Sequence, residues 1–226
     1  MNNKTKIVIL ASSFSLCVLT VGADKKEDMF NPVNTAVTSQ TIAPDARAGS
    51  MGDVGAATDP DVNSQYWNPA KYPFNISRAG VSINYTPWLR QLVNDIDLAQ
   101  LVGYYRIGDY SAVSASLRYF SLGEVQLSES ENALTINPYE MSLDVAYSLM
   151  LSEKFSLAAA VRWIYSDLTY DYTDQTSPAS AFAADIACYY QNYINIGARE
   201  CQLGLGMNIS NIGSKITFGG SDRSEF

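Results

Sequence analysis

The chain has 226 residues, a formal net charge of −8, 47% apolar residues and 17% charged residues. This length suits one domain or two, and the apolar fraction is too high for a disordered chain. The acidic balance argues against nucleic acid as a partner, because phosphates are bound by Lys and Arg. The chain contains no His, which excludes a Ser-His-Asp or Cys-His triad and a His-ligated metal within these residues. The sequence therefore predicts neither an enzyme nor a cofactor.

Residues 1–23 have the pattern of a secretory signal peptide. Two lysines precede a mostly apolar run at 7–21, small residues follow at 22 and 23, and the chain turns polar at Asp24. The run is too short for a membrane-spanning helix. A lipoprotein signal through Cys17 is the weaker alternative, because Leu16 stands where such a signal has a small residue. The mature protein is therefore expected beyond the inner membrane.

After residue 78, apolar side chains alternate with small or polar ones in seven segments. These segments are 79–85, 96–104, 113–119, 141–149, 155–165, 182–190 and 203–209. The second is the least regular, because Gln100 interrupts an apolar set made of Ile96, Leu98, Val102 and Tyr104. Successive side chains of a strand point to opposite faces, so each segment predicts a strand with one apolar face and one small or polar face.

The segment lengths and the connections favour a transmembrane barrel over a soluble β-sandwich, which remains the alternative. The strands are long enough to cross a bilayer at a tilt, and aromatic residues gather near their ends, as in interfacial girdles. Short connections at 107–110, 151–154 and 191–200 alternate with long ones at 87–95, 121–140 and 169–180. The prediction is an all-β, antiparallel outer-membrane barrel over residues 77–226, with short turns in the periplasm and long loops outside the cell.

Residues 24–76 form a different region, because 38–72 do not alternate. Gly49, Gly52 and Gly55 would allow close backbone approach, and Asn68-Pro69 is a turn or helix-start signal. The region is either a surface linker or a plug in the barrel mouth. Gly204 and Gly206, on the polar face of the last regular strand, would leave room for a plug.

Two stretches of this region resemble the PorV family. They are 46–55, Ala-Arg-Ala-Gly-Ser-Met-Gly-Asp-Val-Gly, and 63–70, Asn-Ser-Gln-Tyr-Trp-Asn-Pro-Ala. The residues that carry this plug motif are Arg47, Gly49, Gly52, Asp53, Trp67, Asn68 and Pro69. Residues 208–218 are similar to a strand-end motif of the same family. Because relatives have roughly twice as many strands and this chain stops at 224–226, just after an eighth strand would begin, the chain is interpreted as a fragment with seven or eight strands.

The resemblance implies a fold like that of the FadL fatty acid transporters and a place in the outer membrane, in contact with its lipids. It also implies a component of the type IX secretion system. Such a protein would bind the translocon, capture cargo through the cargo's C-terminal domain and carry it to the attachment complex at the cell surface. The rivals are a FadL-like importer of hydrophobic molecules, disfavoured by the small and polar lumen faces, and a lipid deacylase, disfavoured by the missing His.

Four charged residues of alternating sign are expected on the lumen face of four successive strands. They are Arg118, Asp144, Arg162 and Asp185. Adjacent strands lie ~4.8 Å apart, so neighbours would be close enough to pair across the sheet. The set predicts a structural charge ladder, or alternatively a polar floor that lines a pocket or docks the plug through Arg47 or Asp53.

Two remaining features are ambiguous from sequence. Cys188 and Cys201 should both face outward on one hairpin, either as two lipid-facing thiols or as a disulfide in this oxidising compartment. The loop 165–172, with Asp167, Asp171 and Asp174 in or near it, is either a solvated acidic loop or a site for a partner or Ca²⁺.

Overall fold

The computed structural model describes residues 37–88, 95–126, 135–168, 178–197, 199–214 and 216. The chain divides into two units, Met1–Thr35 and Ala36–Phe226, and the description below concerns the second. The predicted signal peptide, residues 24–36 and the expected eighth strand lie outside the described residues.

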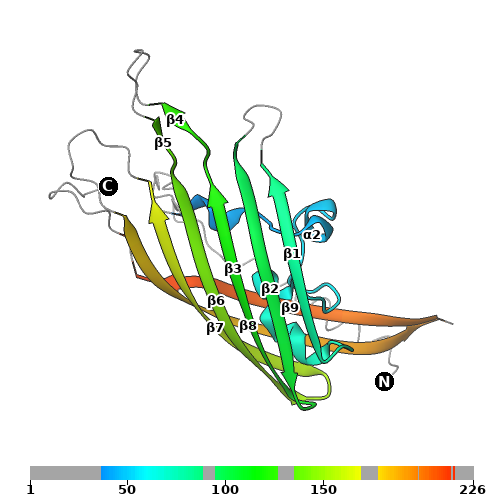
Figure 1. Ribbon diagram of the computed structural model, residues 1–226. Coiled ribbons are helices and arrows are strands. Elements are labelled where there is room, and N and C mark those ends of the chain that lie inside the picture. Colours follow the sequence, from blue (N-terminus) through cyan, green and yellow to red (C-terminus); the bar gives the residue numbers. More distant parts are fainter. Residues whose placement is uncertain are drawn as a thin grey trace, which may run out of the picture. The chain divides into compact units, whose positions relative to one another are not determined.

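Among the described residues, seven strands form one antiparallel sheet, which curls into a half-barrel (Figure 1). In spatial order these are β1 (Ala79–Pro87), β2 (Asp97–Ile107), β3 (Ser111–Ser121), β6 (Tyr139–Ser152), β7 (Phe155–Asp167), β8 (Ala179–Ile196) and β9 (Arg199–Gly213). Every strand pairs with the next one along the chain, apart from a short hairpin of β4 (Val125–Gln126) and β5 (Thr135–Ile136) between β3 and β6. The predicted all-β antiparallel architecture is confirmed.

The two faces of the sheet differ as the alternation predicts. In β3, β6, β7 and β8, buried positions alternate with exposed ones. The concave inner face carries the small and polar side chains, such as Ser116, Ala146 and Ala158, which are buried. The convex outer face carries large apolar side chains that remain exposed, such as Val145 and Val161. An apolar outer surface around a polar interior is the arrangement of a barrel in lipid.

The face predicted for the apolar residues of β2 is wrong. Leu98, Val102 and Tyr104 are buried on the inner face, together with Gln100. The outer face of β2 carries the other alternate set of residues, which includes Leu101. The apolar residues point inward here because non-strand residues pack against this part of the sheet and remove it from water.

The short connections lie at one end of the half-barrel. The β2–β3 turn contains Gly108 and the β8–β9 turn contains Gly197, both in the left-handed region, with φ of 73° and 66°. Residues 191–196 and 199–200 belong to β8 and β9, so the connection predicted at 191–200 is much shorter than expected. Strands β4 and β5, the end of β1 and the start of β2 lie at the opposite end (Figure 1). This separation of short and long connections agrees with the predicted alternation.

Residues 37–78, here called the docked segment, lie on the inner face of the sheet (Figure 1). The segment contains short helices η1 (Thr38–Thr41), α2 (Ala46–Ser50), α3 (Ser64–Trp67) and η2 (Pro69–Phe74). Helix η2 packs on β6, β7 and β8. Within the ranges that the structure describes, no helix is both long and apolar enough to cross a membrane.

Candidate functional site: the segment docked on the inner face

The first half of the plug motif folds around one carboxylate. Asp45 caps the N-terminus of α2, where one of its oxygens accepts a hydrogen bond from the Ala48 amide at 3.0 Å. Its other oxygen accepts from the Trp67 indole N–H at 3.1 Å. A Cβ on Gly55 would lie 2.1 Å from the Trp67 ring, so this glycine lets the indole approach the backbone. Asp45 and Gly55 therefore tie α2 to α3.

The remaining residues of this half serve different purposes. Arg47 forms an ion pair with Asp61 at 2.8 Å on the exposed side of the segment, and so does not reach the sheet charges. Gly52 and Asp53 both have left-handed backbone, with φ of 79° and 57°, and they turn the chain after α2. The expected close backbone approach at Gly49 is wrong, since a Cβ there would meet no atom nearer than 4.0 Å.

Asn68 joins the docked segment to the sheet. It is fully buried, and its side-chain oxygen caps η2 by accepting from the Ala70 amide at 3.0 Å. Its amide nitrogen donates to two carbonyls at 2.9 Å, those of Ala56 in the same segment and of Cys188 in β8. Pro69 follows at the first helical position, where its missing N–H costs nothing. Asn68-Pro69 is therefore a helix start, as the sequence indicates.

Serines of the sheet hold the backbone of η2. Ser148 of β6 donates to the Pro69 carbonyl at 2.7 Å, and Ser156 of β7 donates to the Ala70 carbonyl. Both serine side chains are completely buried. The small polar residues that line the inner face thus bind the carbonyls of a short helix that would otherwise be buried unpaired. This contact explains why the inner face needs small polar side chains at these positions.

Two glycines of β9 admit the docked segment, as predicted. A Cβ on Gly204 would lie 2.7 Å from the Ala57 carbonyl oxygen, and one on Gly206 would lie 1.9 Å from that of Ala56. Both distances are impossible for a real side chain, so glycine is required at these two positions. At the other edge of the sheet, the Asn84 side chain of β1 donates to Asn63 at 2.8 Å, so the docked segment spans the inner face from β1 to β9.

Apolar contact with the segment explains the inward face of β2. The Tyr72 and Tyr104 rings stack with centroids 4.8 Å apart, and both pack in one cluster with Val62 and Ala112. The Tyr72 hydroxyl donates to the Val62 carbonyl at 2.9 Å. Burial of two aromatic rings contributes both hydrophobic free energy and a favourable ring geometry.

The predicted charge ladder is a cluster of three residues plus a separate arginine. Asp144 and Arg162 are directly opposite in register. The Arg162 guanidinium donates to Asp144 at 2.5 Å and to Asp185 at 3.0 Å, and all three side chains are buried. The Ser116 hydroxyl donates to the second Asp144 oxygen, and the main-chain N–H of Asn211 donates to Asp185. The cluster thus joins strands β3, β6, β7, β8 and β9.

Arg118 turns toward the docked segment instead of toward Asp144. Its guanidinium donates to the Ser39 and Ile42 carbonyls and lies over the Tyr66 ring, 5.2 Å from the centroid. Burial raises the pKa of the Tyr66 phenol, so this ring stays neutral. Of the four predicted ladder residues, Arg118 therefore contacts the docked segment, through two backbone carbonyls and the Tyr66 ring, and this contact does not involve Arg47 or Asp53.

Lys71 is the functional-site residue that sequence reasoning missed. Its side chain is buried, and its ammonium donates to the Gly55 carbonyl at 2.7 Å and to the Thr58 hydroxyl at 3.2 Å. Burial lowers the pKa of Lys71 from 10.5 to about 8, although the charge of Asp61 opposes the shift. Nothing in the local sequence distinguishes Lys71 from an exposed lysine, because its acceptors lie 13 and 16 residues away.

The Lys71 environment predicts a pH dependence of stability. Between pH 8 and pH 10 the unfolded lysine stays charged while the folded one loses its proton, so the unfolded chain binds more protons. The free energy of unfolding should therefore rise by up to about 2 kcal/mol between pH 8 and pH 10. The same increase is lost when the pH is lowered again to 8. Denaturant unfolding at several pH values checks this. Lys71→Met should remove the rise, and an unchanged slope would contradict the assignment.

The last two predicted features are the cysteine pair and the acidic loop. Cys188 and Cys201 are free thiols, because Cys188 pairs in register with Met207 and Cys201 pairs with Ile194. Asp171 and Asp174 lie outside the described residues. Within the described ranges, no group of three potential ligands could hold a metal ion.

Comparison with known proteins agrees with the resemblance that the sequence motifs indicated. The protein-family model described as PorV, a type IX secretion system protein, matches residues 24–226. The match begins at the residue after the predicted signal-peptide cleavage. A comparison with curated proteins finds no match. Because the family match covers nearly the whole chain and includes both motif stretches and all seven strands, the chain belongs to the PorV family of type IX secretion system proteins.

Proposed function

We propose that this protein is an outer-membrane component that receives cargo from the type IX translocon and carries it to the surface attachment complex. The matched family is one of type IX secretion system proteins. The observation that carries the proposal is the occupied inner face, where Asn68 and Arg118 join the docked segment to the sheet. Because the docked segment covers the inner face, we favour binding of cargo at the ends of the strands over transport of a molecule through the interior.

The outer face supports the membrane location. Exposed apolar side chains cover the middle of the sheet, among them Leu117, Leu143 and Val145. Near the long-connection end, the rings of Tyr119, Tyr139 and Tyr165 form a row across β3, β6 and β7, with centroids 5.7 and 6.0 Å apart. Aromatic rows of this kind lie at the boundary of the hydrocarbon layer. The long connections then lie on the cell-surface side, where they are free to contact cargo or the translocon.

The main rival is a FadL-like importer of hydrophobic molecules. A passage for such molecules needs an apolar lining. Among the described residues, much of the inner face instead presents serines, the Asp144–Arg162–Asp185 cluster and the carbonyl-binding Arg118. The apolar inner face of β2 is packed against Tyr72 and Val62 of the docked segment. A lipid deacylase lacks support, since the chain has no His to act as a base.

Deletion of the gene is expected to stop cargo export while fatty acid uptake continues normally. Cargo proteins should accumulate uncleaved in the periplasm, as immunoblots of fractionated cells would show, because no other component would pass them to the attachment complex. The protein should also co-purify with cargo from detergent-solubilised outer membranes. Normal secretion together with impaired uptake of a hydrophobic nutrient would reject the proposal in favour of the importer.

A matched loop variant tests the contact surface. Replacing 127–134 with a short Gly-Ser linker leaves the residues of β4 and β5 unchanged. We expect weaker co-purification of cargo or translocon with an unchanged thermal midpoint. The same replacement at the short β6–β7 turn, at Glu153 and Lys154, should leave co-purification unchanged.

A further inference from the structure

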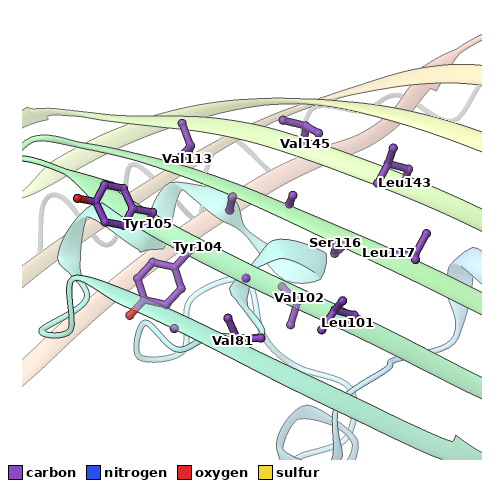
Figure 2. Close-up of a pocket in the computed structure, with 14 residues that line it drawn as sticks. Val81, Leu101, Val102, Tyr104, Tyr105, Val113, Ser116, Leu117, Leu143 and Val145 are labelled. Atoms are coloured by element: carbon purple, nitrogen blue, oxygen red, sulfur yellow. The ribbon is translucent and has the colours of Figure 1, made fainter.

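A hollow interrupts the apolar outer face over β1, β2, β3 and β6 (Figure 2). Its volume is about 670 Å³, which is within the ~300–1,000 Å³ range of small-molecule sites. The hollow follows from one row of the sheet, in which Val81, Gly103, Ala115 and Val145 are neighbours in register. Gly103 and Ala115, the two smallest of these residues, lie in the middle of this row, so the surface is depressed there.

Larger side chains form the walls of the hollow on both sides of that row. Leu101 and Leu117, paired in register, stand on the long-connection side, and Tyr105 and Val113 stand on the short-turn side. These four side chains are all exposed, together with Leu143 next to Leu117. The lining is almost entirely apolar (Figure 2). A ligand for such a surface is a hydrocarbon chain.

A positive charge stands at the short-turn side of the hollow. Arg78 is exposed and directly precedes β1, and its guanidinium carbon lies 5.6 Å from the centroid of the Tyr105 ring. Within the described ranges, the ion pairs are those of Arg47 and Arg162, so Arg78 has no carboxylate partner there. The Arg106 amide donates to the Arg78 carbonyl at 2.8 Å, which places the arginine next to the β2–β3 turn. Its guanidinium is therefore available to an anion at the membrane boundary.

We propose that this hollow binds one glycerophospholipid from the periplasmic leaflet of the outer membrane. One acyl chain lies in the hollow over Gly103 and Ala115, and the phosphate accepts hydrogen bonds from Arg78. A guanidinium matches a phosphate with two parallel donors, and a tyrosine beside it suits the interface between headgroup and hydrocarbon. The inference rests on the proposed membrane location and orientation, and it adds a specific lipid site to a surface that otherwise contacts bulk lipid.

Native mass spectrometry of the full chain, purified from outer membranes in mild detergent, tests the site. The wild-type protein should retain one phospholipid. Gly103→Leu fills the hollow, and a Cβ at this position makes ordinary contacts of 3.5 Å with the Gly80 carbonyl and 3.6 Å with Val81, so the sheet should tolerate it. Gly103→Leu and Arg78→Gln should each lower lipid retention at least about tenfold, as expected for losing the apolar site or a charge-assisted hydrogen bond.

Two matched variants serve as controls. Ala159→Leu adds the same side chain to the exposed outer face of β7, outside the hollow, and Arg199→Gln removes an exposed arginine from the start of β9. Both should retain lipid as the wild type does. Equal retention by all variants would overturn the lipid site. So would a loss of cargo export in Gly103→Leu with lipid retention unchanged, which would mark the hollow as a protein contact. Absence of the wild-type chain from the outer-membrane fraction would instead reject the proposed location itself.

Discussion

Gly206→Val is expected to expel the docked segment from the inner face. A Cβ at residue 206 would lie 1.9 Å from the Ala56 carbonyl oxygen and 2.9 Å from the Asn68 amide nitrogen. The first of these is a backbone atom and cannot move aside alone. The cost should therefore meet or exceed the ~1–3 kcal/mol that is usual for overpacking. Displacement of 56–57 would also break the hydrogen bond from Asn68 to Ala56 and so loosen η2.

Limited proteolysis of the detergent-solubilised protein measures this effect. The wild type should resist cleavage within 37–78, because the segment is packed on the sheet, and Gly206→Val should be cleaved there rapidly. Gly103→Val is the matched control, since it places the same side chain on a strand glycine whose Cβ would make only ordinary contacts. If Gly206→Val were protected like the control and melted at the wild-type temperature, 56–57 would not lie against β9 as described.

Arg162→Ala should strongly destabilise the protein. The substitution leaves Asp144 and Asp185 buried on the inner face without their common cation. Removing one partner of a buried ion pair costs about 3–5 kcal/mol. Each carboxylate keeps one other donor, the Ser116 hydroxyl for Asp144 and the Asn211 amide for Asp185, but these donors do not neutralise two negative charges. The free energy of unfolding in detergent, from denaturant titration, gives the effect.

A double mutant tests whether the two charges act together. Asp144→Asn removes one of the crowded carboxylates, so it should restore part of the stability that Arg162→Ala loses. Strict additivity of the two changes would show that Asp144 and Arg162 do not interact. Arg47→Ala is the matched control for loss of an arginine, because the Arg47–Asp61 pair is partly exposed to solvent and exposed pairs contribute only ~0–1 kcal/mol.

The sequence alone determined the strands and most of their faces. A period of two reports directly which residues share a face of a strand, and it identified β3, β6, β7, β8 and β9 with their outward apolar side chains. Asn68-Pro69 gave a helix start through local capping chemistry. Gly204 and Gly206 indicated close backbone approach, because a glycine in a strand interior otherwise costs stability.

The tertiary structure alone decided what covers each face and which charges meet. Alternation cannot say which of two faces is buried, so the inward set of β2 depended on Tyr72 and its neighbours. Arg118 had Asp144 as a plausible partner in sequence, yet its acceptors are carbonyls 76 and 79 residues away. Lys71 is buried where the docked segment folds back on itself, against Gly55 and Thr58, which lie 16 and 13 residues earlier. These choices depend on contacts between distant residues, and local patterns carry no information about such contacts.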